Sequence, residues 1–105
     1  MPKASRASQV RTFTDIPNIG KAMAKDFPLI GIMEPEEIAG QDPYDMYERL
    51  CTATNARQDP CVLDTFIAVV RFMEGGPALP WWHYTEERKA RRTRNDRASS
   101  SEMDL

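Results

Sequence analysis

The chain has 105 residues, of which 41% are hydrophobic and 29% charged, and its formal net charge is −2 at pH 7. This length predicts one domain with a modest core. The most apolar stretch, residues 62–73, is interrupted by Asp64, Thr65 and Arg71 and is far shorter than the roughly 20 residues that a membrane span needs. We therefore expect a soluble protein with no membrane association.

The charge is unevenly distributed along the chain. Residues 1–27 carry five basic and two acidic side chains. Residues 28–87 carry three basic and eleven acidic side chains, and residues 88–105 carry six basic and three acidic side chains. An acidic middle between two cationic ends disfavours a protein that DNA surrounds on all sides. Any contact with DNA should therefore be local.

The two cysteines, Cys51 and Cys61, match neither a zinc-binding spacing nor a disulfide-rich secreted framework, and no hydrophobic signal segment precedes them. We expect a reducing cytoplasm as the compartment, with no metal and no cofactor.

Residues 1–8 are small, polar and basic and are expected to form a flexible arm. Val10, Phe13 and Ile16 are three residues apart, which predicts a short first helix. The most informative stretch follows, Ile16-Pro17-Asn18-Ile19-Gly20-Lys21. This string predicts the tight turn of a helix-hairpin-helix, in which proline ends the first helix and Asn18 and Gly20 are the residue types that tolerate a positive φ. Ile16 and Ile19 are expected to point inward and anchor the turn on the core.

Such a turn often grips a nucleic-acid phosphate. Glycine leaves room for the phosphate, the N–H groups that open the next helix have no intrahelical partner, and lysine adds charge. The candidate phosphate-binding residues are Asn18, Ile19, Gly20, Lys21, Ala22 and Lys25. The alternative interpretation is a helix-to-helix turn without a ligand.

The second helix is predicted over residues 21–27, with Met23 and Phe27 facing inward and Lys21 and Lys25 facing solvent. A short helix is predicted over residues 34–39, closed by glycine.

Two Asp-Pro pairs, Asp42-Pro43 and Asp59-Pro60, are strong helix-start signals. The first starts a helix that ends near Asn55, and its charged residues Asp45, Glu48 and Arg49 are expected to face outward. Its apolar stripe consists of Met46, Tyr47, Leu50, Cys51 and Thr54. The second starts a helix over residues 61–74 that is apolar on most of its circumference and should be buried centrally.

The segment 79–84 is rich in proline and aromatic residues and should lie across the surface without forming a helix, followed by a basic helix from Thr85 that frays near Asn95. Trp81 and Trp82 either stack on exposed bases or pack, one on the core and one on the C-terminal helix. The basic run is either a solvated helix face or an auxiliary nucleic-acid contact formed by Arg88, Lys89, Arg91 and Arg92.

Cys61 follows a helix start, where the helix dipole would lower its pKa and suit a nucleophile. No base is identifiable nearby, because His83 is the only histidine, and Asp59 and Asp64 oppose a thiolate. A buried structural thiol is the preferred interpretation, for Cys51 as well. We expect no enzymatic activity.

No segment alternates as a half-buried strand does, so the fold class is predicted to be all-α. We expect a compact bundle of about five short helices with tandem helix-hairpin-helix units, one clear and one degenerate around Gly40-Gln41-Asp42-Pro43. The expected organisation is an arm over residues 1–8, a domain over residues 9–90, and a basic, then disordered tail over residues 91–105.

Several spaced motifs, in order, resemble the small bacterial helix-hairpin-helix proteins of the pathogenicity-locus family, which are often labelled mitomycin resistance proteins. Besides the hairpin string, the matching pieces are Gly40-Gln41-Asp42-Pro43, Tyr47-Glu48-Arg49-Leu50-Cys51, Arg57-Gln58-Asp59-Pro60-Cys61-Val62-Leu63-Asp64 and Pro80-Trp81-Trp82. The resemblance covers about residues 10–90. The chain is also distantly similar to the helical C-terminal domain of TfoX-type competence regulators.

The resemblance implies a helical fold and an association with DNA transactions or DNA-damage tolerance, and no established reaction. Together with the hairpin, it predicts a non-enzymatic DNA-binding protein that holds phosphates without sequence specificity. The alternative is a protein-interaction adaptor with no direct DNA contact.

Overall fold

The computed structural model describes residues 3–91, and within them the chain forms helices, turns and loops but no strand. The elements in order are η1 (Ala7–Gln9), η2 (Phe13–Asp15), α1 (Lys21–Ala24), α2 (Asp26–Leu29), η3 (Pro35–Ile38), α3 (Pro43–Thr54), α4 (Pro60–Met73) and η4 (Trp81–Tyr84). The chain is α-helical again over residues 85–91. The all-α prediction is confirmed.

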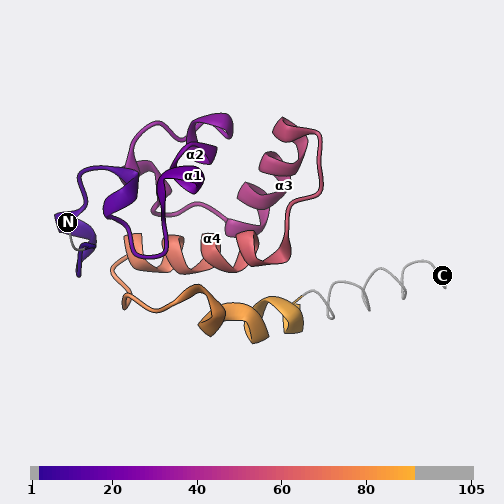
Figure 1. Cartoon of the computed structure of the whole chain (residues 1–105). Coiled ribbons are helices and arrows are strands. Elements are labelled where there is room, and N and C mark those ends of the chain that lie inside the picture. The colour runs from indigo at the N-terminus through magenta and orange to yellow at the C-terminus, as the bar shows by residue number, and fades with distance from the viewer. Residues whose placement is uncertain (1–2, 92–105) are drawn as a thin grey trace.

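Helix α4 is the centre of the fold. Figure 1 shows it running between the N-terminal half of the chain with α3 on one side and the segment from η4 to residue 91 on the other. Nine of its residues are buried, which explains why its sequence is apolar almost all round. The Asp59 carboxylate caps its start by accepting a hydrogen bond from the Cys61 N–H at 3.3 Å. No helix among residues 3–91 has the length and apolar character needed to cross a bilayer.

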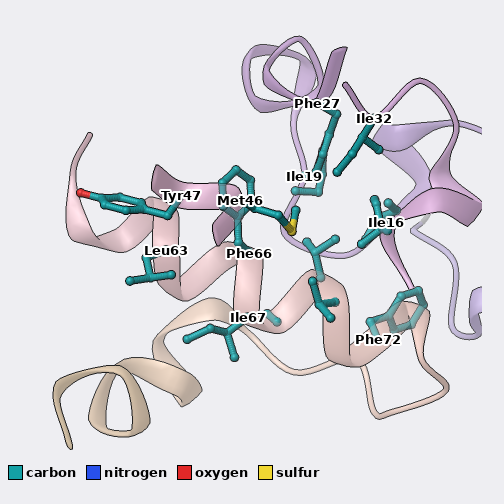
Figure 2. Packing of buried hydrophobic residues seen from close by; sticks show 14 of the residues in the cluster. Ile16, Ile19, Phe27, Ile32, Met46, Tyr47, Leu63, Phe66, Ile67 and Phe72 are labelled. Carbon is teal, nitrogen blue, oxygen red and sulfur yellow. The ribbon is translucent and has the colours of Figure 1, made fainter. Parts of the chain in front are cut away.

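The core forms where the N-terminal turns meet α3 and α4 (Figure 2). The Phe27 ring stacks on Phe13, with centroids 4.6 Å apart, and tilts against Phe66 of α4 at 5.9 Å. The fully buried side chains also include Ile16, Ile19, Ile32, Ile38, Met46, Leu50, Ile67 and Val69. The core thus fixes the turn between Ile16 and Ile19 onto the rest of the domain.

The predicted first helix is wrong as an α-helix, because residues 7–15 contain only the two 3-10 turns η1 and η2. The Asp15 carboxylate accepts hydrogen bonds from the N–H groups of Arg11 and Thr12 at 3.0 and 3.1 Å. These bonds hold Thr12 extended, at φ −129° and ψ 164°, and so compete with a continuous helix.

The predicted helix over residues 21–27 is two separate turns, α1 and α2, with Lys25 between them. Pro28 accounts for the interruption, since proline has no N–H to donate to the Ala24 carbonyl and its ring clashes with that carbonyl in a continuous helix. Phe27 is buried, as expected, and Met23 packs on the core. The helix predicted over residues 34–39 is the 3-10 turn η3.

Helix α3 begins and ends as predicted, with the Asp42 side chain accepting from the Tyr44 N–H at 2.9 Å and Asn55 in the left-handed region at φ 51°. Thr54, expected on the apolar stripe, is exposed, so its predicted orientation was wrong. Arg49 is half-exposed: it pairs with Asp45 at 2.9 Å and also donates to the Ile30 carbonyl and the Gln41 side chain at 2.8 and 2.9 Å. Arg49 therefore ties α3 to the end of α2.

Residues 3–8, expected as a flexible arm, contact the rest of the domain at several points. The Ala4 N–H donates to the Asp15 carbonyl at 2.8 Å, and the Lys3 ammonium donates to the carbonyls of Thr14 and Ile19. The segment 79–84, expected to lack helix, forms the turn η4, and its Tyr84 is 6% exposed and belongs to the core.

Candidate nucleic-acid interface

The hairpin turn, residues 16–21, has the predicted anchors but a different backbone pattern. Ile16 and Ile19 are fully buried, and Asn18 is left-handed at φ 76°. Gly20 is extended, at φ −95° and ψ −178°, so it does not use the positive φ that glycine tolerates. The left-handed residue that makes the turn is Asn18, a residue type that tolerates this region.

Gly20 leaves open space in front of the turn. A Cβ built on it meets no heavy atom within 4 Å, and no side chain caps α1. The Ile19 N–H, predicted to be available, instead donates to the Ile16 carbonyl at 3.1 Å. The open N–H groups are therefore those that begin α1, at Lys21 and Ala22, which have no intrahelical acceptor.

The rim of this turn is cationic. Lys21, Ala22 and Lys25 are exposed, as expected for the solvent side. The Lys3 ammonium, which sequence reasoning did not assign to this site, reaches the Ile19 carbonyl from the N-terminal segment. The acidic neighbour of this rim is Asp26, whose pKa is raised by burial.

Asn18 joins the hairpin turn to the aromatic segment more than sixty residues away. Its side-chain Nδ2 donates to the Leu79 carbonyl at 2.8 Å, and its Oδ1 accepts from the Trp81 N–H at 3.2 Å. Both polar atoms of the amide are used, so Asn18 positions the turn rather than holding a phosphate through its side chain. No sequence signal indicated this pairing.

The second, degenerate hairpin lacks the features of the first. Gly40 is left-handed at φ 85°, and its N–H donates to the Glu74 carboxylate at 3.0 Å. The Asp42 carboxylate occupies the start of α3. Two carboxylates therefore stand where a phosphate would bind, and their charge repels it.

Arg88 is part of a buried ion pair, which corrects its assignment as an auxiliary nucleic-acid contact. Its Nε donates to Asp64 Oδ1 at 2.8 Å and its Nη2 to Oδ2 at 3.3 Å, while the Thr85 hydroxyl donates to Oδ2 at 2.8 Å. Asp64 is fully buried in α4. The hydrogen bonds with Asp64 raise the pKa of Arg88, and they explain why a polar residue interrupts the apolar run.

The other predicted auxiliary residues have different surroundings. The Arg91 guanidinium lies over the Tyr44 ring, 4.0 Å from its centroid, so it also packs against the fold. Lys89 is exposed. Arg92 and the rest of the predicted tail lie outside the described residues.

Trp82 is exposed, at 64% of its surface. Its ring meets Trp81 edge to face, with centroids 5.6 Å apart, and Trp81 is half-buried. Tyr84 takes the place in the core and neither tryptophan belongs to it, so the expectation that one tryptophan covers the core was wrong.

Both thiols are partly exposed rather than fully buried. Burial raises the pKa of Cys61, and the nearby Asp59 carboxylate raises it further, so the helix start does not produce a thiolate. Cys51 packs against the core, and its sulfur accepts from the Gln58 N–H at 3.4 Å. Within residues 3–91, no three or more histidine, cysteine or acidic side chains gather as metal ligands.

The family relationship follows from comparison with known proteins. The chain is 47% identical over 76 residues to a protein named mitomycin resistance protein McrB from Streptomyces lavendulae, and this match spans 72% of each protein. No solved structure matches the chain significantly. The family model described as pathogenicity locus matches residues 6–90, so the chain belongs to the pathogenicity-locus family.

Proposed function

We propose that this chain is a non-enzymatic protein that binds DNA without sequence specificity and acts in DNA-damage tolerance. The observation that carries the proposal is the hairpin turn, which is anchored in the core by Ile16 and Ile19 and open in front of Gly20. A rigid turn with an open, cationic face suits a phosphate, because the binding groups are ordered before the ligand arrives.

In this mechanism the N–H groups of Lys21 and Ala22 and the Lys21 ammonium contact a phosphate. Lys25 and Lys3 add positive potential from the two flanks of the turn. None of these groups contacts a base, so the affinity for DNA is expected to be independent of base sequence and to fall steeply with salt concentration. Arg88 is left out of this contact set because Asp64 holds its guanidinium.

The link to DNA-damage tolerance comes from the relative's name, which refers to mitomycin resistance. Mitomycin damages DNA, so a DNA-binding protein is one physical route to resistance. We extend this association to the present chain as part of the proposal.

The absence of catalysis is also a proposal, supported by the Cys61 environment. A raised thiol pKa means that, near neutral pH, the nucleophilic thiolate is less populated than in a free cysteine. In a Cys51→Ser variant, where Cys61 is the remaining thiol, we expect iodoacetamide to alkylate Cys61 at pH 8 more slowly than it alkylates the thiol of a model peptide. Faster alkylation than the peptide would contradict the non-enzymatic assignment.

A titration of duplex DNA at several salt concentrations tests the main proposal. Lys21→Glu should weaken binding by about tenfold or more and flatten the slope of log affinity against log salt by about one unit or more. The matched control is Arg57→Glu, which makes the same charge change at an exposed arginine. Arg57 pairs with Glu48 and is far along the chain from the hairpin turn. Equal losses in both variants, or none in Lys21→Glu, would overturn the hairpin contact.

The second candidate function is the protein-interaction adaptor. It is favoured by two exposed apolar side chains, Leu29 at 54% and Met33 at 62%, and by a shallow hollow that Leu29, Ile30 and Ala53 help to line. The two functions separate experimentally, because a Leu29→Ser, Met33→Ser double variant should lose a protein partner and keep its DNA affinity.

A further inference from the structure

We infer that Trp82 and the hairpin turn form one binding surface for DNA with unpaired bases, in which Trp82 stacks on a base while the turn holds the neighbouring backbone. This inference rests on the proposed DNA-binding function and names its ligand class. Base stacking on an aromatic ring suits unpaired nucleotides, because the bases of an intact duplex are already stacked on each other.

The Asn18 amide is the joint that places these two features together. Its two hydrogen bonds, to the Leu79 carbonyl and from the Trp81 N–H, connect the turn to the chain directly before Trp82. From these bonds and the length of the intervening chain, the Cα atoms of Lys21 and Trp82 lie no more than about 25 Å apart. A DNA strand carries one phosphate per roughly 3.4 Å in a duplex, so a short strand reaches both.

Trp82 has the exposure that stacking on a base requires. It is 64% exposed, whereas Tyr84 fills the core position of this segment. The Trp81 and Trp82 rings meet edge to face at a centroid distance of 5.6 Å, which limits the orientations of the Trp82 indole. A large apolar ring held in a restricted orientation at the surface loses little entropy on binding.

The charges around Trp82 favour a strand that runs toward the turn. The acidic Glu87 is paired with Arg71 at 3.2 Å, but Glu86 is exposed on the following helix. On the other side of the Asn18 joint stand Lys21, Lys25 and Lys3. These lysines attract a negatively charged backbone to the hairpin side, whereas the helix over residues 85–91 carries Glu86 together with the cationic Lys89 and Arg91.

The test compares a single-stranded thymidine oligonucleotide of about 15 nucleotides with a duplex of the same length. Trp82→Ala should lower the affinity for the single strand by about 5- to 100-fold, and Trp82→Phe should restore most of it. The duplex affinity should change less than about twofold, because a duplex leaves no base free to stack. Met33→Ala is the matched control, since it removes an equally exposed apolar side chain.

Fluorescence gives a direct second readout. The chain has two tryptophans, so Trp81→Phe leaves Trp82 as the sole indole. Binding of the single strand should quench the Trp82 emission and reduce its further quenching by iodide. Unchanged single-strand affinity in Trp82→Ala, with duplex binding still sensitive to Lys21→Glu, would overturn this inference and leave the proposed function standing.

The remaining outcomes also decide between the two proposals. No affinity of the parent protein for either oligonucleotide would overturn both. A protein partner lost in Trp82→Ala, with both DNA affinities unchanged, would assign the indole to a protein interface and overturn the inference alone.

Discussion

The two cationic ends of the chain differ in what their charges face. At the hairpin turn, Lys21 and Lys25 are exposed beside an open glycine, and the Lys3 ammonium donates to two backbone carbonyls. Near the C-terminus, Arg88 is held by a buried aspartate and Arg91 lies on an aromatic ring. Residues 1–27 and 88–105 each have three more basic than acidic side chains, yet the described parts present these charges differently.

The difference shows that regional charge does not measure the charge available to a ligand. A guanidinium offers several donors and packs well against carboxylates and rings, so arginines are suited to join elements of a fold. The hairpin lysines carry compact, well-hydrated ammonium groups on flexible stems and remain in solvent. The predictions below test this contrast between a binding end and a packed end.

The largest expected effect is the loss of stability in Arg88→Ala. The change leaves the Asp64 carboxylate fully buried without its partner, which should cost about 3 kcal/mol and lower the melting temperature by more than about 10 °C. Thermal unfolding followed by circular dichroism measures it. Lys21→Ala is the control and should unfold within about 0.5 kcal/mol of the parent. Similar melting temperatures for all three proteins would remove the contrast.

The next effect is at the joint between the hairpin and the aromatic segment. Asn18→Asp keeps a residue that tolerates the left-handed backbone but replaces the donor to the Leu79 carbonyl with an acceptor. We expect a loss of about 1–3 kcal/mol in urea unfolding. Asn18→Gly preserves the left-handed backbone but removes the side chain, and it should also lower the free energy of unfolding. An unchanged midpoint in both would mean that the joint contributes nothing.

Gly20 and Gly40 test whether each of the two hairpin turns needs glycine for its backbone conformation. Gly40 is left-handed, so Gly40→Ala should cost about 1–2 kcal/mol. Gly20 is extended and has open space at its Cβ, so Gly20→Ala should change stability by less than about 1 kcal/mol in either direction. Paired denaturant titrations decide the matter. A Gly20→Ala loss as large as that of Gly40→Ala would show that the turn needs glycine for its backbone.

The smallest effect is expected at Arg91. Removing the guanidinium from the Tyr44 ring with Arg91→Ala should cost about 0.5–1 kcal/mol, because the pair is at the surface. Tyr44→Leu should lose a similar amount, and the double variant should lose less than the two single losses added together. Strict additivity would show that the ring and the guanidinium do not interact.

The sequence by itself determined the features that depend on local chemistry. Nearby residues and their spacing predict the Asp-Pro starts of α3 and α4, the end of α3 at Asn55, the burial of Ile16 and Ile19 and the all-α class. Caps and turns are set by bonds within a few residues, so their signals remain readable in the chain. The spaced motifs also indicated the family correctly.

Tertiary structure decided what those residues face. The Asp64–Arg88 pair joins residues 24 positions apart, and the Asn18 amide bonds reach 61 and 63 positions along the chain. Neither partner's local sequence carries a sign of the other, because a side-chain hydrogen bond depends on where packing brings two atoms. For the same physical reason, only the fold showed that the Gly40 N–H of the degenerate hairpin donates to Glu74, a carboxylate 34 positions along the chain.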